Sequence, residues 1–364
     1  MQDTSFRRAT CVLASRSGMR DRLPEHSETS LKIDVFNHIL PKHVFERIRT
    51  VAPQIPILNS FNNLPELWDV EAHLRLMDGY DGYQQVLSLS NPPIEMLGSP
   101  EITPKMAQLA NDGLAEICRA HPDRFPAFIA SMPMNNPDAA VKEAERAVKE
   151  LDARGIQIFS NVLGKPLSAP EFYPVFETMA KFDLPIWVHP MRGPNFADYA
   201  TESASEDEIW FTFGWPYETS ACMTRLIYSG IFDKLPNLKI ITHHMGGMIP
   251  FFAEKINLGF KQIFDGKVDR NPTAEKAGLK RPLIDYYRML YADTSTNGSA
   301  SAARCGLDFF GADHCLFATD APFDSRGGHH LIGGTIRAID SLDIQANERH
   351  AIYEGNAKRL LRLS

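Results

Sequence analysis

The stretch KIITHHMGG, residues 239–247, decides the fold prediction. An apolar run, Leu238–Ile241, predicts a short β-strand, and two histidines, His243 and His244, follow it before a glycine pair. Parallel strands of a (β/α)8 barrel deliver polar, titratable side chains to the active site where each strand leaves the core. This stretch therefore predicts one strand of such a barrel, with functional residues at its carboxyl end.

Three other strand-like runs end in the same way. His38 follows KIDVFN, His189 follows PIWV, and Asp320 follows LFAT. One such strand would mean little, but four in one chain predict a common floor of three histidines and an aspartate. Imidazole and carboxylate groups are the donors that a catalytic zinc ion takes from proteins. The strand ends therefore predict a metal site.

Eight apolar runs alternate with helical segments from residue 31 onward, which predicts an α/β fold. A helix is expected over Asp138–Leu151, with Gly155 closing its turn. Right-handed βαβ units in this number close into a (β/α)8, or TIM, barrel, here with long βα-loop insertions. A doubly wound sheet is the alternative, but it does not explain polar residues at so many strand ends. The predicted strands are Leu31–Phe36, Gln85–Leu89, Ala127–Met132, Gly155–Phe159, Pro185–His189, Leu238–His243, Met289–Ala292 and Cys315–Thr319.

The domain prediction is one barrel over residues 31–364, preceded by a flexible arm over residues 1–30. The arm is rich in Arg, Ser and Thr and keeps no strand or helix period. Its Asp and Glu residues argue against a transit peptide, and the apolar core of a signal peptide is absent.

The composition predicts a cytoplasmic protein that acts on a small molecule. A net charge of −7 gives no electrostatic reason to expect nucleic acid as a partner. No apolar run approaches the about 20 residues that cross a bilayer, so no membrane association is expected. The 5 cysteines are scattered and form no C-x-x-C pair, which indicates reduced thiols and argues against disulfides or a zinc knuckle.

Five motifs in sequence order resemble one enzyme family, the decarboxylase branch of the amidohydrolase superfamily. That branch contains aminocarboxymuconate semialdehyde decarboxylase and γ-resorcylate decarboxylase, which act on muconate-type and aromatic acids. The resemblance covers about residues 31 to 364, and the order of the motifs makes it specific for the family, not for a substrate. The motifs are KIDVFNHILP (32–41), VHP (188–190), HMGG (244–247), ATDAPF (318–323) and GNAKRLL (355–361).

The resemblance implies a divalent metal, zinc first and manganese as the alternative, at the mouth of the barrel. His38, His189 and Asp320 match the family's metal ligands. His244 matches the catalytic histidine, and Asp320 is also expected to move a proton. A homodimer is the family's expected assembly.

Phe36 departs from the family pattern, because it occupies the first position of the His-x-His ligand pair and cannot bind a metal. Three protein ligands remain, which is enough for a catalytic zinc ion. The alternative is a site that works without a metal, as related lactonases are thought to do.

Substrate contacts are predicted on the long connection after the fifth strand. Arg192 follows His189 by three residues, and its guanidinium suits a carboxylate; a surface ion pair with Asp198 or Glu202 is the alternative. Glu218 is expected either to complement a helix dipole from the first turn or to add a polar group to the pocket.

Aromatic residues are concentrated in the same connection, and they are Trp210, Phe211, Phe213, Trp215 and Tyr217. Two interpretations of these residues stay open. They form either an apolar wall for a flat substrate, in which Trp215 is the expected substrate contact, or a subunit interface. His243 is expected beside the pocket in a supporting role, because alternation along the strand points it away from His244. Asp293, after the seventh strand, is expected to support a ligand or to cap a helix.

The predicted reaction is metal-dependent, non-oxidative decarboxylation of an aromatic or muconate-type acid. A hydrolase or hydratase acting on a lactone, an amide or an unsaturated diacid is the main alternative, since the same ligands serve both chemistries. A non-catalytic barrel with a decayed site is the third interpretation, but it leaves four polar strand ends without a physical reason.

Overall fold

The structure is a computed structural model, and it describes residues 31–259 and 272–363. The predicted arm, residues 1–30, lies outside the described residues, so the division into arm and barrel stays a prediction.

The strands are short and mostly parallel. Parallel pairs are β1–β3, β2–β3, β3–β4, β5–β6, β6–β9, β9–β10, β10–β11 and β11–β12, and within the described residues only the hairpin β7–β8 is antiparallel. Their bounds are β1 (Lys32–Asp34), β2 (His38–Ile39), β3 (Tyr83–Leu89), β4 (Ala127–Phe128), β5 (Ala130–Ser131), β6 (Ile156–Phe159), β7 (Asn161–Val162), β8 (Lys165–Pro166), β9 (Ile186–His189), β10 (Ile240–Thr242), β11 (Tyr291–Asp293) and β12 (Cys315–Leu316).

Backbone hydrogen bonds beyond these ladders close the strands into a ring. β4 and β5 are two halves of one strand, because Ile129 between them donates its N–H to the Leu87 carbonyl at 2.9 Å. The last strand meets the first where Val35 N–H donates to the Phe317 carbonyl at 3.0 Å and Asp320 N–H to the Phe36 carbonyl at 2.9 Å. The predicted (β/α)8 arrangement therefore describes this chain, and each predicted strand overlaps an observed one.

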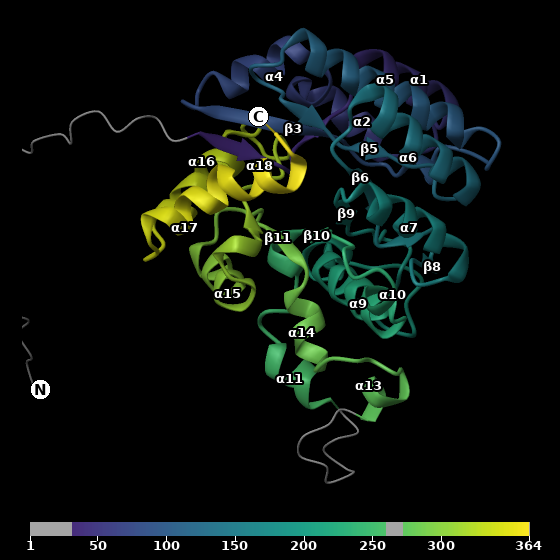
Figure 1. Cartoon of the computed structure of the whole chain (residues 1–364). Helices are drawn as coiled ribbons and strands as arrows, with labels where there is room; N and C mark the ends of the chain where they lie inside the picture. The colour runs from purple at the N-terminus through teal and green to yellow at the C-terminus, as the bar shows by residue number, and fades with distance from the viewer. Residues whose placement is uncertain (1–30, 260–271, 364) are drawn as a thin grey trace, which may run out of the picture.

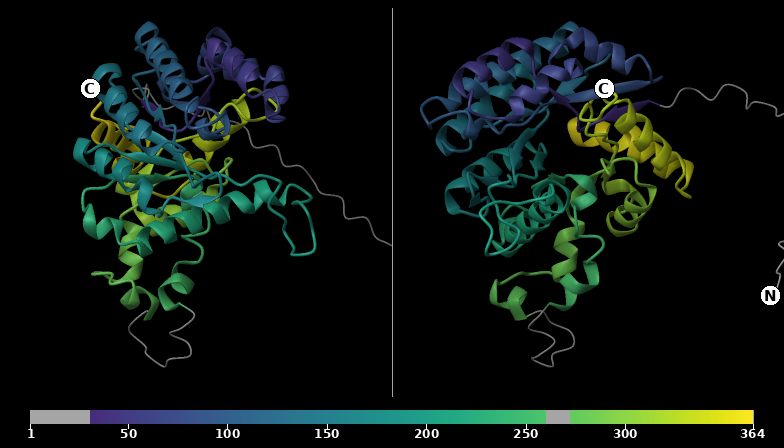
Figure 2. Two further views of the ribbon diagram at one scale, coloured as in Figure 1. Left: turned by 90° about the vertical axis from the view of Figure 1, so that its right-hand side faces the viewer. Right: turned by 180° about the vertical axis from the view of Figure 1, so that it is seen from behind.

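Helices surround the ring, as Figure 1 shows, and α11, α13 and α14 lie together outside it. From the other sides, the connection after β9 extends beyond the helices (Figure 2). The bounds are α1 (Lys42–Val51), α2 (Ile57–Ser60), α3 (Pro65–Trp68), α4 (Val70–Met77), α5 (Thr103–Ala120), α6 (Pro137–Leu151), α7 (Tyr173–Phe182), α8 (Ile209–Thr212), α9 (Gly214–Tyr228), α10 (Ile231–Lys234), α11 (Ala253–Leu258), α13 (Pro272–Lys276), α14 (Leu283–Arg288), α15 (Ala300–Phe310), α16 (His329–Asp340), α17 (Ala346–His350) and α18 (Asn356–Leu361).

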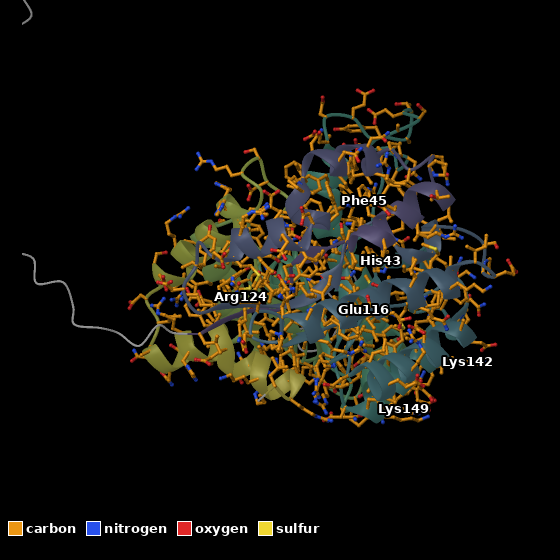
Figure 3. All side chains as sticks on the ribbon, turned by 90° about the horizontal axis from the view of Figure 1, so that it is seen from above. His43, Phe45, Glu116, Arg124, Lys142 and Lys149 are labelled. Atoms are coloured by element: carbon orange, nitrogen blue, oxygen red, sulfur yellow. The ribbon has the colours of Figure 1, made fainter. Side chains whose placement is uncertain are left out.

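Two apolar cores hold the fold together. The larger one lies between the strands and the helices, and the smaller one contains strand residues such as Val86, Ile129, Trp187 and Ile241 together with α18. The outer faces of the helices are charged, as Glu116 on α5 and Lys142 and Lys149 on α6 illustrate in Figure 3. Apolar burial on one helix face and charge on the other is the pattern of helices that pack on a sheet.

Two local predictions were wrong in detail. The predicted turn after α6 is closed by Asp152, whose φ is +62°, and Gly155 serves close packing instead, since a Cβ there would lie 2.6 Å from Cζ3 of Trp187. The first predicted strand is interrupted after Asp34, because the Asp34 carboxylate accepts the Phe36 N–H at 3.0 Å and turns the chain.

None of the helices in the described part of the chain combines the length and the apolar character that a membrane span requires.

Candidate active site

Asp320 lies at the centre of the site, where it contacts His38 from the beginning of the barrel and His244 from its second half. Its Oδ1 lies 3.0 Å from His38 Nε2 and its Oδ2 lies 3.5 Å from His244 Nε2. The backbone of Asp320 is left-handed, with φ at +66°, and its N–H is bound to the first strand. This strained conformation turns the carboxylate toward both histidines, as is common at functional sites.

The ionised state of Asp320 is strongly favoured. Burial opposes the charge, but hydrogen bonds from His244 and His38 outweigh burial and hold the pKa of Asp320 well below its ordinary value. The same contact acts on His244: burial opposes its charged form, but the Asp320 carboxylate overcomes this and raises the pKa of His244. His244 therefore holds a proton more readily than an exposed histidine does, and its φ of +54° shows that it too is held under strain.

His243 is fully buried, and Asp293 fixes its orientation. The Asp293 Oδ2 accepts the Nδ1–H of His243, and its Oδ1 accepts the His244 N–H at 2.9 Å and the Ser295 N–H at 3.1 Å. Burial lowers the pKa of His243, so the ring is neutral with its proton on Nδ1. Nε2 is buried and has no partner among the described residues.

His189 is also a neutral ring with a defined tautomer. Its Nδ1 donates to the Pro190 carbonyl at 2.6 Å, so the lone pair of the ring is on Nε2, where it accepts a hydrogen bond from the Asn91 amide. Asn91 Nδ2 lies 3.4 Å from that nitrogen. Burial, and then the neighbouring His243 and His38, hold the pKa of His189 well below its ordinary value. A neutral imidazole with Nδ1 bound to a carbonyl is the usual form of a metal-binding histidine.

Phe36 occupies the middle of these rings. It is fully buried, and its ring centroid lies 4.6 Å from that of His38, 5.6 Å from His189 and 3.5 Å from His243, on which it stacks. The sequence placed Phe36 at the missing ligand position, and the structure places it among the predicted site histidines.

Arg192 makes a different ion pair from those predicted. Its Nη1 lies 3.2 Å from Glu218 Oε1, and both side chains are largely buried, at 19% and 18% exposure. The alternative of a surface pair with Asp198 or Glu202 was wrong. Glu218 lies in the second turn of α9, so the first-turn dipole interpretation was also wrong. Burial raises the pKa of Glu218, and Arg192 offsets only part of this effect.

The aromatic residues of the long connection divide into two groups. Trp215 packs edge-on against His189 with ring centroids 5.4 Å apart, and Trp210 and Phe211 pack on Trp215. The indole N–H of Trp215 donates to the Arg192 carbonyl at 3.1 Å, which connects this group to the ion pair. Phe213 and Tyr217, by contrast, are 66% and 55% exposed. The packed group around Trp215 therefore suits the interpretation as a substrate wall, and the exposed Phe213 and Tyr217 suit the interpretation as a subunit interface.

Two residues of the loop after β3 were missed in the sequence. Asn91 contacts His189, and Glu95 is only 3% exposed, with an Oε1 that has no partner in the described part of the chain. Burial raises the pKa of Glu95 to about 8. The usable signal was the polar pair Ser90 and Asn91 after an apolar strand, a pattern similar to the one that pointed to the four predicted residues.

The donor set was compared with the needs of a divalent metal. His38 Nε2 and Asp320 Oδ1 are hydrogen-bonded to each other at 3.0 Å, and a metal ion would take the place of the proton between these two donor atoms. His243 Nε2 has a lone pair without a partner among the described residues, and the lone pair of His189 Nε2 is bound only by the Asn91 amide. Within residues 31–259 and 272–363, however, no three His, Cys, Asp or Glu side chains are gathered closely enough to hold an ion as they stand. The residue types fit a metal, and a third donor has to move toward the His38–Asp320 pair.

Comparison with known proteins assigns the family. The sequence profile described as amidohydrolase matches residues 33–363, nearly the whole chain. The chain belongs to the amidohydrolase family. Among related proteins, this amidohydrolase is 32% identical to a γ-resorcylate decarboxylase of Polaromonas sp., over 81% of this chain and 87% of that protein. It is 27% identical to 2-amino-3-carboxymuconate-6-semialdehyde decarboxylase of Dictyostelium discoideum, over 92% of each chain.

Solved structures agree with the sequence relatives. A dihydroxybenzoic acid decarboxylase from Polaromonas sp., with bound manganese and the inhibitor 2-nitroresorcinol, superposes with a TM-score of 0.74 at 27% identity, covering 92% of this amidohydrolase and 97% of that chain. A 2,6-dihydroxybenzoate decarboxylase in complex with 2,6-dihydroxybenzoate gives the same score at 26% identity, covering 92% and 100%. Both solved structures are decarboxylases of dihydroxybenzoic acids, in agreement with the family predicted from the motifs.

Proposed function

We propose that this amidohydrolase is a carboxy-lyase that removes carbon dioxide, without oxidation, from an aromatic or muconate-type carboxylic acid. The observation that carries the proposal is the Asp320 carboxylate between His38 and His244, with the Trp215 wall beside His189. The decarboxylase relatives support the same reaction class.

The proposed cofactor is one divalent metal held by His38, His189 and Asp320. Imidazole donors together with one carboxylate suit zinc, while a similar Polaromonas structure holds manganese. When bound, the ion would polarise the carboxylate or a neighbouring oxygen of the substrate.

His244 is proposed to supply the proton that replaces carbon dioxide. The bond between the carboxyl carbon and the ring or diene carbon breaks, and its electron pair stays on that carbon. His244 donates its proton there to form the new C–H bond, and solvent then reprotonates His244. Asp320 favours the protonated form of His244 before the step, which is the condition for a general acid.

Arg192 is proposed to bind the acid substrate. Its guanidinium is largely buried and already pairs with Glu218, so a substrate carboxylate would share it with that residue. Trp215, supported by Trp210 and Phe211, would cover one face of a flat ring and exclude water from the reacting carbon. His243, next to His189, would complete the floor beneath the substrate.

A carbon dioxide release assay tests the function. Purified protein loaded with Zn2+ or Mn2+ is incubated with hydroxybenzoates and with muconate semialdehydes, and product is followed by chromatography. Release of carbon dioxide that is lost in His244→Ala and Asp320→Asn is expected. Turnover of lactones without carbon dioxide release would refute the decarboxylase and favour the hydrolase.

We also infer a cytoplasmic homodimer. Tyr199, Phe213 and Tyr217 are 69%, 66% and 55% exposed, all on the connection after β9 or the first turns of α9. Phe213 and Tyr217 are neighbours one helical turn apart, and neighbouring exposed apolar side chains are typical of a protein interface. Light scattering of the eluting protein is expected to give twice the chain mass for the native chain and the chain mass for Phe213→Ser/Tyr217→Ser. A monomeric native protein would refute this assembly.

A further inference from the structure

We propose that His243 is an additional metal ligand, which takes the place of the ligand lost at Phe36. The proposal rests on the metal dependence proposed above and adds to it a donor that the family motif does not contain. His243 comes from the strand end of β10, one residue before the histidine that matches the family motif.

The first argument is the unpartnered nitrogen of His243. The side chain is fully buried, and its Nε2 has no hydrogen-bond partner among the described residues. Leaving a buried polar atom unpaired costs about 1–3 kcal/mol, so the unpaired nitrogen of His243 requires an explanation. A metal ion would satisfy this lone pair.

His73, a second buried histidine of this protein, shows the hydrogen bonds of a histidine with a purely structural role. His73 is also fully buried, but its Nδ1 bonds the Glu66 carbonyl at 2.7 Å and its Nε2 bonds Gln85. Both nitrogens of His73 are satisfied within the protein, whereas only one nitrogen of His243 is.

The direction of the free nitrogen follows from Asp293. Asp293 ends β11, on one side of β10, and binds Nδ1 of His243. The two nitrogens lie on different edges of the ring, so Nε2 is turned away from β11. His189 ends β9, on the other side of β10, and its ring centroid is 5.6 Å from that of His243.

Asp293 also gives His243 the partner that metal-binding histidines normally have. Such a histidine usually donates its second N–H to a carboxylate or a carbonyl, which fixes the tautomer and makes the free nitrogen a better donor. His189 has the carbonyl of Pro190 in this role, and His243 has the Asp293 carboxylate.

The contact with Phe36 connects His243 to the vacant ligand position. The two rings stack with centroids 3.5 Å apart and an angle of 28° between their planes. His243 therefore reaches the space next to the side chain that stands where the family has its first ligand. The residue after β1 that lacks a donor and the residue after β10 that has a free one are therefore in contact at the same point of the barrel floor.

The test is a metal-affinity measurement on His243→Asn. The amide of Asn can occupy the position of Nδ1 and keep the bond to Asp293, while Nε2 is lost. The matched control is His314→Asn, because His314 also bonds a carbonyl, Leu290 O at 3.0 Å, but lies at the opposite end of the strands. Zn2+ affinity is measured by competition with a chromogenic chelator, and the visible spectrum of the Co2+-loaded protein reports the donor set.

The expected result is a dissociation constant for Zn2+ at least about a hundredfold higher in His243→Asn, since even partners behind metal ligands are worth 10–100-fold. The Co2+ spectrum should change in His243→Asn and stay native in His314→Asn. Adding Phe36→His to His243→Asn should restore much of the affinity.

Native affinity and a native Co2+ spectrum in a folded His243→Asn protein would overturn the inference while leaving the metal proposal intact. A native protein that binds neither ion would overturn both, so the two failures are distinguishable. If His243→Asn does not fold, Asp293→Asn is used instead, and unchanged affinity in that variant would also overturn the inference.

Discussion

Replacing Glu95 with glutamine should remove a large part of the pH dependence of stability. The Glu95 side chain is 3% exposed, and burial raises its pKa to about 8 from the 4.5 of an exposed glutamate. Between pH 4.5 and about 8 the folded protein keeps a proton that the unfolded chain has released. The free energy of unfolding therefore falls as the pH rises through this window, and the stability is fully present only below pH 4.5.

The magnitude follows from the width of the window. Each pH unit inside it costs about 1.4 kcal/mol, so the native protein should lose about 3 kcal/mol through Glu95 between pH 5 and pH 7. Glutamine has no proton to release, and the Glu95→Gln protein should not show this loss.

Urea unfolding at pH 5, 6 and 7 measures the difference between native protein and Glu95→Gln, so that all other titrating groups cancel. Glu46→Gln, on the exposed side of α1, controls for the loss of one negative charge. A difference between native protein and Glu95→Gln that is the same at all three pH values would refute the reasoning, because it would mean that the Glu95 carboxyl is ionised in the folded protein.

Four further predictions concern the site and the barrel. Asp320→Asn should lower kcat by about 10²–10⁴-fold while circular dichroism shows a folded protein, and a smaller loss would exclude its proposed part in proton transfer. Arg192→Ala should raise KM at least about tenfold with a smaller effect on kcat, because charge-assisted hydrogen bonds are worth about 1.5–3 kcal/mol; an unchanged KM would remove Arg192 from substrate binding. Dialysis against a chelator should abolish turnover and Zn2+ or Mn2+ should restore it, whereas full activity without metal would favour the metal-free alternative. Gly155→Ala should destabilise the fold by about 1–3 kcal/mol in thermal unfolding, since its Cβ would lie 2.5 Å from the Pro185 carbonyl and 2.6 Å from Trp187, and an unchanged Tm would contradict the close packing.

The strand ends were the most predictable part of the protein. Apolar runs buried on both faces and followed by a polar residue predicted both the strand and the polar side chain that follows it, as with His189 and Asp320. Interruptions were less predictable, because the break after Asp34 depends on a side chain that accepts a hydrogen bond two residues away. Strand propensity and hydrophobic periodicity do not show that a side chain will compete with the neighbouring strand for a backbone N–H group.

The partners of charged residues could not be predicted, because they depend on the paths of long loops. Arg192 and Glu218 are 26 residues apart and meet only because α9 returns beside the end of β9. Asn91 was missed for a related reason, since its contact with His189 joins two loops from strands that are not adjacent in the chain. The sequence predicted a supporting role for Asp293 near the site. That one carboxylate accepts hydrogen bonds from both the His243 ring and the His244 N–H could be seen only in the structure.

Phe36 has a consequence for the protein before any ion arrives. A cluster made only of charged or lone-pair-bearing ligands is poorly stable when empty, and small metal-binding domains often fold only with their ion. Here one member of the floor is an apolar ring, fully buried and stacked on a neutral imidazole. The apolar ring removes one donor that would otherwise lie unpaired in the empty site, so the floor of the barrel loses less stability without an ion than a floor made only of ligands would.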